Sequence, residues 1–132
     1  MKQGIILCVD DETMVLESLQ IQLSAHFQGK YLLEFAESAE EAWEIIEEVQ
    51  RESKAEVIVI VSDWLMPGMK GDEFLVRVHR KFPYVIKVLL TGQADESAIR
   101  RAQEEANLRQ CLYKPWDATA LVATIEQALS EL

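Results

Sequence analysis

Five short runs of β-branched and apolar residues alternate along the chain with five stretches of helical periodicity. This alternation is typical of parallel strands joined by crossover helices, and it constrains the fold more than any other feature of the sequence. The expected strands are Ile5–Val9, Tyr31–Ala36, Val57–Ser62, Lys87–Thr91 and Gln110–Tyr113. We therefore predict an α/β fold of the (βα)5 type, in which a five-stranded parallel sheet is doubly wound.

The segments between the expected strands carry apolar stripes at helical spacing. The first stripe consists of Leu16, Leu19, Leu23 and Phe27. Ser38 with Glu41 three residues later predicts a capping box at the start of the second helix. Asp95 and Asp117 are expected to cap the fourth and fifth helices. Because we find no linker and no internal repeat, we predict a single domain over residues 1–132.

The composition of the chain excludes several classes of protein. There are 23 acidic and 13 basic residues, so the net charge is −10, and an acidic surface of this kind repels nucleic acid backbones. No apolar run approaches the roughly 20 residues needed to span a bilayer, and the amino-terminal residues do not resemble a signal peptide. Two cysteines in a chain with a full-sized core indicate a reducing compartment. We therefore expect a cytoplasmic protein that binds neither nucleic acid directly nor a membrane.

Polar residues stand at the ends of four expected strands. Asp10 and Asp11 follow the first strand, and Asp63 follows the third. Thr91 ends the fourth strand and Lys114 follows the fifth. In a doubly wound sheet of flavodoxin-like strand order 2-1-3-4-5, the ligand crevice lies at the carboxyl ends of the strands. We therefore expect these five side chains to converge on one edge of the sheet.

This set of residue types suits phosphoryl transfer. Two carboxylates about 4 Å apart repel each other by roughly 4 kcal/mol at an effective dielectric constant near 20. Three of them therefore require a cation, or one of them must keep its proton. Oxygen ligands in an open crevice favour Mg²⁺ or Mn²⁺. Lys114 offers a positive charge to a phosphate oxygen, and Thr91 offers a hydroxyl donor. A carboxylate nucleophile beside these groups would complete a site for phosphoryl transfer.

These residues belong to motifs that resemble the receiver domain of bacterial two-component response regulators. The motifs are Val9-Asp10-Asp11-Glu12, the run from Ser62 to Gly71, Leu90-Thr91-Gly92 and Lys114-Pro115-Trp116. The resemblance implies that Asp63 accepts a phosphoryl group from a kinase histidine. It also implies that Asp10, Asp11 and the Leu65 backbone carbonyl hold the metal together with Asp63. Thr91 and Lys114 would bind the phosphoryl oxygens, and the Lys114–Pro115 peptide would be cis.

The resemblance also implies partners and a mode of action. A sensor histidine kinase or phosphotransfer protein would supply the phosphoryl group, and the change would be read out on the face made by the fourth helix, fifth strand and fifth helix. Such a domain is a regulatory module that promotes its own phosphorylation and slow dephosphorylation, and a homodimer is compatible with it. The runs Leu89–Asp95 and Lys114–Asp117 resemble receivers fused to cyclic-di-nucleotide phosphodiesterases or hybrid histidine kinases. We therefore expect an output domain outside these 132 residues.

One position departs from the pattern of this family. An aromatic residue commonly stands three positions before the lysine, and here that position is Cys111, with Tyr113 two residues further on the same strand face. A degenerate receiver that binds partners without phosphorylation is therefore the alternative function. A haloacid-dehalogenase-like phosphatase is a weaker alternative, because it requires a second aspartate two residues after the first, where Leu65 stands.

Overall fold

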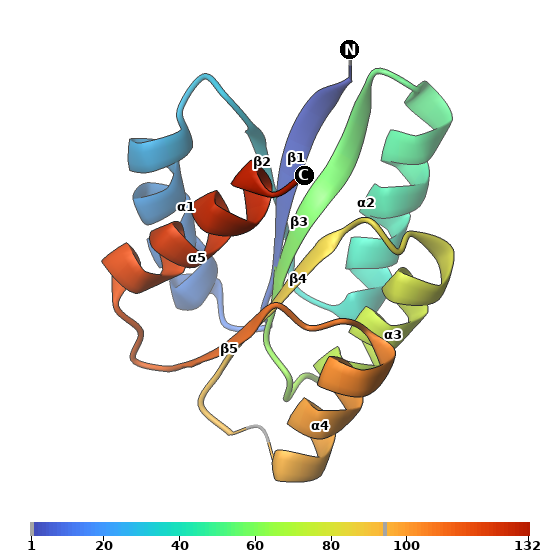
Figure 1. The fold of residues 1–132 in the computed structure, drawn as a ribbon, viewed down its shortest axis with the longest axis vertical. Helices are drawn as coiled ribbons and strands as arrows, with labels where there is room; N and C mark the ends of the chain where they lie inside the picture. Colours follow the sequence, from blue (N-terminus) through green and yellow to red (C-terminus); the bar gives the residue numbers. More distant parts are fainter. Residues whose placement is uncertain (1, 94) are drawn as a thin grey trace.

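The computed structural model describes residues 2–93 and 95–132, so Met1 and Ala94, which belongs to the Leu89–Asp95 run, lie outside the described residues. The sheet has five parallel strands in the order β2-β1-β3-β4-β5 (Figure 1). The strands are β1 (Gln3–Val9), β2 (Leu32–Ala36), β3 (Ala55–Ser62), β4 (Ile86–Thr91) and β5 (Gln110–Tyr113). The helices are α1 (Thr13–Phe27), α2 (Ala39–Glu52), α3 (Gly71–Lys81), α4 (Glu96–Glu105) and α5 (Ala118–Ser130). The predicted fold class and strand order are confirmed.

The first and third strands begin two residues earlier than predicted. Gln3 pairs with Ala55 in the parallel ladder, and the Gln3 amide donates a hydrogen bond to the Lys54 carbonyl at 2.9 Å. These residues lie before the apolar runs of both strands, so backbone pairing continues where the hydrophobic pattern has not yet begun. No helix in the described part of the chain is long and apolar enough to cross a membrane.

The sheet separates two hydrophobic cores, because successive side chains of a strand point to opposite faces. Ile5 and Leu7 of β1 pack into the core beneath α2, α3 and α4. Ile6 and Cys8 of the same strand pack into the core beneath α1 and α5. Figure 1 shows this arrangement, with α1 and α5 on one side of the sheet and the other three helices on the opposite side. Helices on both faces leave the ends of the sheet as the places where a polar site can form.

The three predicted capping residues all accept a hydrogen bond, but of the predicted capping box at Ser38 the described residues show only the bond from the Glu41 amide. The Ser38 hydroxyl accepts a hydrogen bond from the Glu41 amide at 3.1 Å. Asp95 accepts from the Ala98 amide, and the Asp117 carboxylate accepts from the amide two residues on. Each cap satisfies one of the amides that a helix leaves without a partner in its first turn. Together the three caps define the residues at which α2, α4 and α5 begin.

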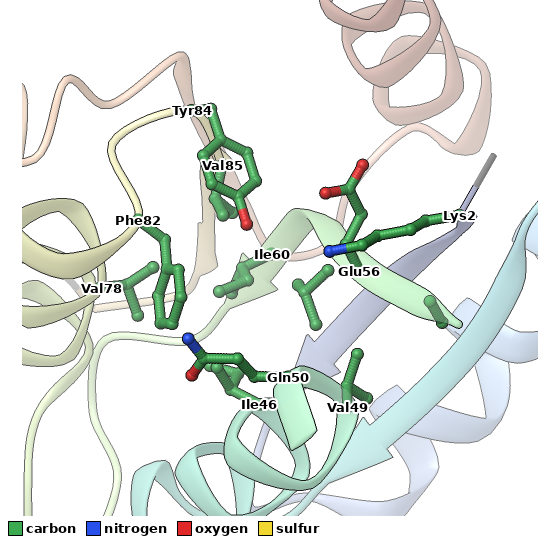
Figure 2. A pocket seen from close by; sticks show the side chains of 12 residues that line it. Lys2, Ile46, Val49, Gln50, Glu56, Ile60, Val78, Phe82, Tyr84 and Val85 are labelled. Atoms are coloured by element: carbon green, nitrogen blue, oxygen red, sulfur yellow. The ribbon is translucent and has the colours of Figure 1, made fainter. Parts of the chain in front are cut away.

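An apolar pocket of about 110 Å³ lies at the amino ends of the strands (Figure 2). Its walls include Ile46 of α2, Ile60 of β3 and Phe82 at the end of α3. Its polar lining residues are Lys2, Gln50, Glu56 and Tyr84. None of the polar residues predicted to form the site lines this pocket. The chemistry predicted from the sequence is therefore located at the opposite end of the sheet.

Lys87 of β4 is a charged residue that is only 1% exposed. Its ammonium group lies 2.7 Å from Nδ1 of His79 at the end of α3, and it donates to the Pro83 carbonyl at 3.3 Å. No carboxylate in the described part of the chain forms an ion pair with it. Burial lowers the pKa of Lys87 to about 8 from its ordinary 10.5. The folded domain therefore holds a poorly compensated positive charge at neutral pH.

Replacing Lys87 with methionine is expected to stabilise the fold at neutral pH by about 1–3 kcal/mol. The lost bonds to His79 and Pro83 reduce the gain but do not reverse it. Because the folded pKa of Lys87, about 8, lies below 10.5, the unfolded chain binds more protons between these values. Wild-type stability therefore rises with pH in that window, and the advantage of the variant shrinks. Urea unfolding of both proteins near pH 7 and near pH 10 measures the difference, and a constant difference would contradict the prediction.

Candidate functional site

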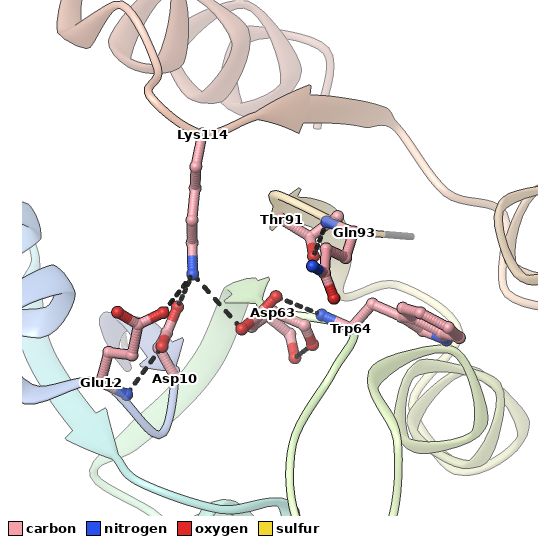
Figure 3. A network of polar contacts seen from close by, with 8 residues as sticks. Asp10, Glu12, Asp63, Trp64, Thr91, Gln93 and Lys114 are labelled. Atoms are coloured by element: carbon pink, nitrogen blue, oxygen red, sulfur yellow. Dashed lines mark hydrogen bonds and ion pairs between the residues drawn. The ribbon is translucent and has the colours of Figure 1, made fainter. Parts of the chain in front are cut away.

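The polar residues predicted at the strand ends converge at one edge of the sheet (Figure 3). Asp10 lies just after β1, Asp63 just after β3, Thr91 at the end of β4 and Lys114 just after β5. Asp11 is the fifth predicted residue. Asp11, Asp63, Thr91 and Lys114 line one open crevice. The other lining residues are Glu12, Leu65, Met66, Pro67, Gly92 and Gln93. Asp10 does not line the crevice but is bonded to Lys114 and lies beside the other two aspartates, so the structure brings all five side chains together at this edge.

Three carboxylates gather at this edge. One oxygen each from Asp10, Asp11 and Asp63 lies within 4.8 Å of the others. Asp10 and Asp63 are buried and Asp11 is exposed. Burial raises the pKa of Asp10 above its ordinary value, although the hydrogen bond from Lys114 opposes this change. A set of three hard oxygen donors, one of them open to solvent, suits a divalent cation such as Mg²⁺.

The run Asp10-Asp11-Glu12 can also be interpreted as a cap for the first helix, and the structure argues against that interpretation. Asp10 accepts a hydrogen bond at 2.8 Å from the amide of Glu12, which precedes α1, and the Glu12 side chain makes no capping bond. The second oxygen of Asp10 accepts from Lys114. The Asp10 carboxylate is therefore directed to the crevice and its loop.

Lys114 brings a positive charge between two of the carboxylates. Its Nζ lies 2.7 Å from Oδ2 of Asp10, 3.3 Å from Oδ2 of Asp63 and 3.6 Å from Oε1 of Glu12. Burial lowers the pKa of Lys114, but the hydrogen bonds and negative charges of Asp10 and Asp63 outweigh burial and raise it overall. The ammonium group therefore stays charged at neutral pH. The Lys114–Pro115 peptide is cis, as the resemblance implied.

The Asp63 carboxylate is held in one orientation by the backbone that follows it. The backbone amide of Asp63 donates to the Val9 carbonyl at 2.9 Å, and the carboxylate oxygen Oδ1 accepts from the Trp64 amide at 2.8 Å. The Trp64 carbonyl accepts from the Gly71 amide at 2.8 Å, so the loop closes against the start of α3. Sequence reasoning did not identify Trp64 and Gly71 as supports of Asp63. The only signal was the position of Gly71 at the end of the motif that begins with Ser62.

Thr91 is buried at the end of β4, and its hydroxyl oxygen accepts a hydrogen bond from the Gln93 amide at 3.3 Å. This bond leaves the hydroxyl proton free to be donated. Thr91 and Gln93 both line the crevice. The site thus combines a carboxylate cluster, an ammonium group and a hydroxyl donor, which together match the needs of a phosphoryl group.

Cys111 occupies the position at which we noted a departure. It is half-buried against the core beneath α4, and Tyr113 on the same face of β5 is 56% exposed. Burial raises the pKa of the Cys111 thiol, and a hydrogen bond with Tyr113 opposes this change. A small, half-buried side chain therefore fills the place of an aromatic ring, and the Tyr113 ring beside it is more than half exposed.

The sequence has relatives among regulatory proteins. The family model of the response regulator receiver domain matches residues 6–126. The hydrogenase transcriptional regulatory protein HoxA of Cupriavidus necator is 32% identical over 128 residues, which cover 97% of this chain and 24% of that protein. The DNA-binding transcriptional regulator NtrC of Escherichia coli is 28% identical over 130 residues, which cover 98% of this chain and 26% of that protein. The chain thus spans about a quarter of the length of these curated relatives.

Solved structures give the same relationship. The signal receiver domain of an HD domain-containing protein from Pseudomonas fluorescens Pf-5 is 32% identical and superimposes with a TM-score of 0.85, covering 99% of this chain and 90% of that one. A CheY-like response regulator receiver domain from Methanospirillum hungatei is 28% identical, with a TM-score of 0.84 and coverage of 98% and 96%. The family match, the fold and these relatives lead to one conclusion: the chain belongs to the response regulator receiver domain family.

Proposed function

We propose that this domain is a phosphorylation-dependent switch of a two-component phosphorelay and that Asp63 is its phosphoacceptor. Receiver domains are regulatory modules that interact with histidine kinases or phosphotransfer proteins. The observation that carries the proposal is the oriented Asp63 carboxylate in an open crevice, beside two further aspartates and the Lys114 ammonium group. The same edge of the sheet holds the Thr91 hydroxyl.

The proposed reaction assigns a role to each of these residues. A carboxylate oxygen of Asp63 attacks the phosphorus of a phosphohistidine, the P–N bond breaks, and the histidine leaves with the bonding electrons. Mg²⁺ or Mn²⁺, held by Asp10, Asp11, Asp63 and the Leu65 carbonyl, would neutralise charge on the transferring group. Lys114 and Thr91 bind the phosphoryl oxygens. The domain in this way promotes its own phosphorylation and, with water as the nucleophile, its slow dephosphorylation.

The readout is proposed on the face formed by α4, β5 and α5, because Lys114 directly follows β5 and Thr91 precedes α4 along the chain. Movement of these two residues toward a phosphoryl group would therefore alter this face. The transcriptional regulators and the receiver of an HD domain-containing protein suggest a longer protein with an output domain. We place the single receiver domain in the cytoplasm, and the same face could support a homodimer.

Phosphorylation is tested by intact-protein mass after incubation with Mg²⁺ and a small acyl phosphate or phosphoramidate. We expect one added phosphoryl group on the wild-type protein. The adduct should be absent from Asp63→Asn and from a sample with a chelator. Asp117→Asn is the matched control, because asparagine also caps helices well and Asp117 lies outside the crevice. Failure of folded wild type to form the adduct with either donor would overturn the proposal and favour the phosphorylation-independent interaction module.

A further inference from the structure

The side chain of Trp64 points away from the carboxylates of the crevice and toward α3 (Figure 3). Its indole Nε1 donates a hydrogen bond to Oδ1 of Asp72, in the first turn of α3, at 3.0 Å. The ammonium group of Lys70 lies over the same ring, 4.9 Å from its centroid. A half-buried indole is thus held by a hydrogen bond at its edge and a cation on its face.

The backbone of the same residue holds the phosphoacceptor. The Trp64 amide donates to Oδ1 of Asp63, and the Trp64 carbonyl accepts from Gly71. The peptide that orients the Asp63 carboxylate therefore belongs to a residue whose side chain is fixed on α3. A displacement of the Trp64 backbone would therefore also act on the indole, which is bonded to Asp72.

Asp72 extends the connection to a second helix. Its side chain is only 13% exposed, and its other oxygen, Oδ2, lies 3.5 Å from Nη1 of Arg101 on α4. Arg101 also pairs with Glu105, one turn further along α4, at 3.6 Å. A continuous series of contacts therefore runs from Asp63 through Trp64 and Asp72 to Arg101. It reaches α4 without passing through Thr91 or Cys111.

We propose that Trp64 and Asp72 are positioning residues for the phosphoacceptor and that Arg101 links their state to α4. This inference rests on the proposed function of Asp63. The ionised Asp63 carboxylate makes a charge-assisted hydrogen bond with the Trp64 amide, and an acyl phosphate at Asp63 makes a weaker one with that amide. The Trp64 peptide then relaxes, and the fixed indole passes the change to Asp72 and Arg101. In the unphosphorylated state the same contacts keep Asp63 in the orientation required for attack.

The first test measures the rate of phosphorylation of the whole chain by a small phosphoramidate with Mg²⁺. Trp64→Phe keeps an aromatic ring but removes the indole N–H, and Asp72→Ala removes its acceptor. Each change should slow the maximal rate about five- to tenfold, the effect of one lost hydrogen bond, and leave the donor concentration for half-maximal rate unchanged. The double variant should be no slower than either single variant, because both remove the same bond. Asp72→Asn keeps an acceptor oxygen and should restore a near-wild-type rate.

Trp43→Phe is the matched control for the indole, since Trp43 packs on Phe74 in the core beneath α2 and does not line the crevice. The free energy of urea unfolding and the phosphorylation rate are measured for Trp43→Phe and Trp64→Phe, so that a loss of stability can be distinguished from a loss of positioning. The control should lose stability and keep its rate. A Trp64→Phe protein that reacts at the wild-type rate would overturn the positioning role.

The second test follows backbone amide NMR shifts of α4 before and after phosphorylation. Asp72→Asn and Arg101→Gln remove the charged pair between α3 and α4, so both variants should accept the phosphoryl group yet lose at least half of the shift change at α4. A full response of α4 in both variants would overturn the link. A wild-type protein that forms no acyl phosphate would overturn the proposed function and this inference with it. If the wild type is phosphorylated and the variants behave like it, the inference is overturned and the proposed function stands.

Discussion

Gly71→Ala is expected to destabilise the folded domain by at least about 3 kcal/mol. A Cβ atom at this position would overlap the Asp63 carbonyl oxygen and would lie 2.9 Å from Cα of Trp64. Both are backbone atoms, so no side-chain rotation relieves the overlap. The acceptor loop, residues 64–70, must move away from α3 and lose the hydrogen bond from the Gly71 amide to the Trp64 carbonyl. The same displacement should slow phosphorylation, because it moves Asp63 itself.

Urea unfolding of Gly71→Ala beside Gly92→Ala measures this effect. Gly92 borders the same crevice, but a Cβ atom there would lie 3.9 Å from Cβ of Lys114, an ordinary contact. The control substitution should change the free energy of unfolding by no more than about 0.5 kcal/mol. If Gly71→Ala is as stable as the control and the wild type, the loop tolerates the added methyl group and its close approach to α3 is not required.

Asp10→Asn is expected to stabilise the metal-free domain and to abolish its stabilisation by Mg²⁺. Burial raises the pKa of Asp10, so the folded state binds more protons than the unfolded state between pH 3.8 and the raised value. Stability therefore falls as pH rises through that window, and the loss persists at neutral pH. Asparagine carries no charge and escapes this loss, while its amide oxygen can still accept the hydrogen bond from Lys114, which keeps the Asp63 carboxylate as its ion-pair partner. The substitution also removes one of the three carboxylates that could bind the ion.

Unfolding curves at increasing Mg²⁺ concentration separate the two effects. Wild type should gain about 2.7 kcal/mol when Mg²⁺ reaches 100 times its dissociation constant, because the ion binds the folded state. Asp10→Asn should start higher in chelator and gain little from the same Mg²⁺ concentrations. Asp117→Asn, outside the crevice, should follow the wild-type curve. An equal gain from Mg²⁺ in wild type and Asp10→Asn would exclude Asp10 as a ligand.

The sequence was most informative where its signals were local. The strand Gln110–Tyr113 was predicted with its observed bounds, and Ser38 was correctly identified as a helix cap. The proximity of Asp63 and Lys114 could be predicted because the carboxyl ends of parallel strands lie at one edge of the sheet, whatever the details of side-chain packing. A periodic pattern and one topological rule were enough to locate the crevice.

Contacts between helices could not be obtained in this way. The contacts from Trp64 to Asp72 and from Asp72 to Arg101 depend on how α3 and α4 pack, and no periodicity specifies that packing. Lys87 is a second example, because lysine is rarely fully buried and no local pattern predicts that this one is. Its burial depends on His79 and on the Pro83 carbonyl, whose positions only the tertiary structure supplies.

Helix α3 is attached at both ends, and this has a mechanical consequence. Asp72 joins its first turn to the acceptor loop, and His79 joins its last turn to Lys87 of β4. Its 11 residues span about 16 Å at 1.5 Å per residue. We expect a short helix held at both ends to move as a rigid body, so that a tilt beginning beside Asp63 would also displace His79 at the opposite end of the sheet. If Asp63 accepts a phosphoryl group as proposed, that event and a change in the protonation of Lys87 would each act on α3, at its opposite ends.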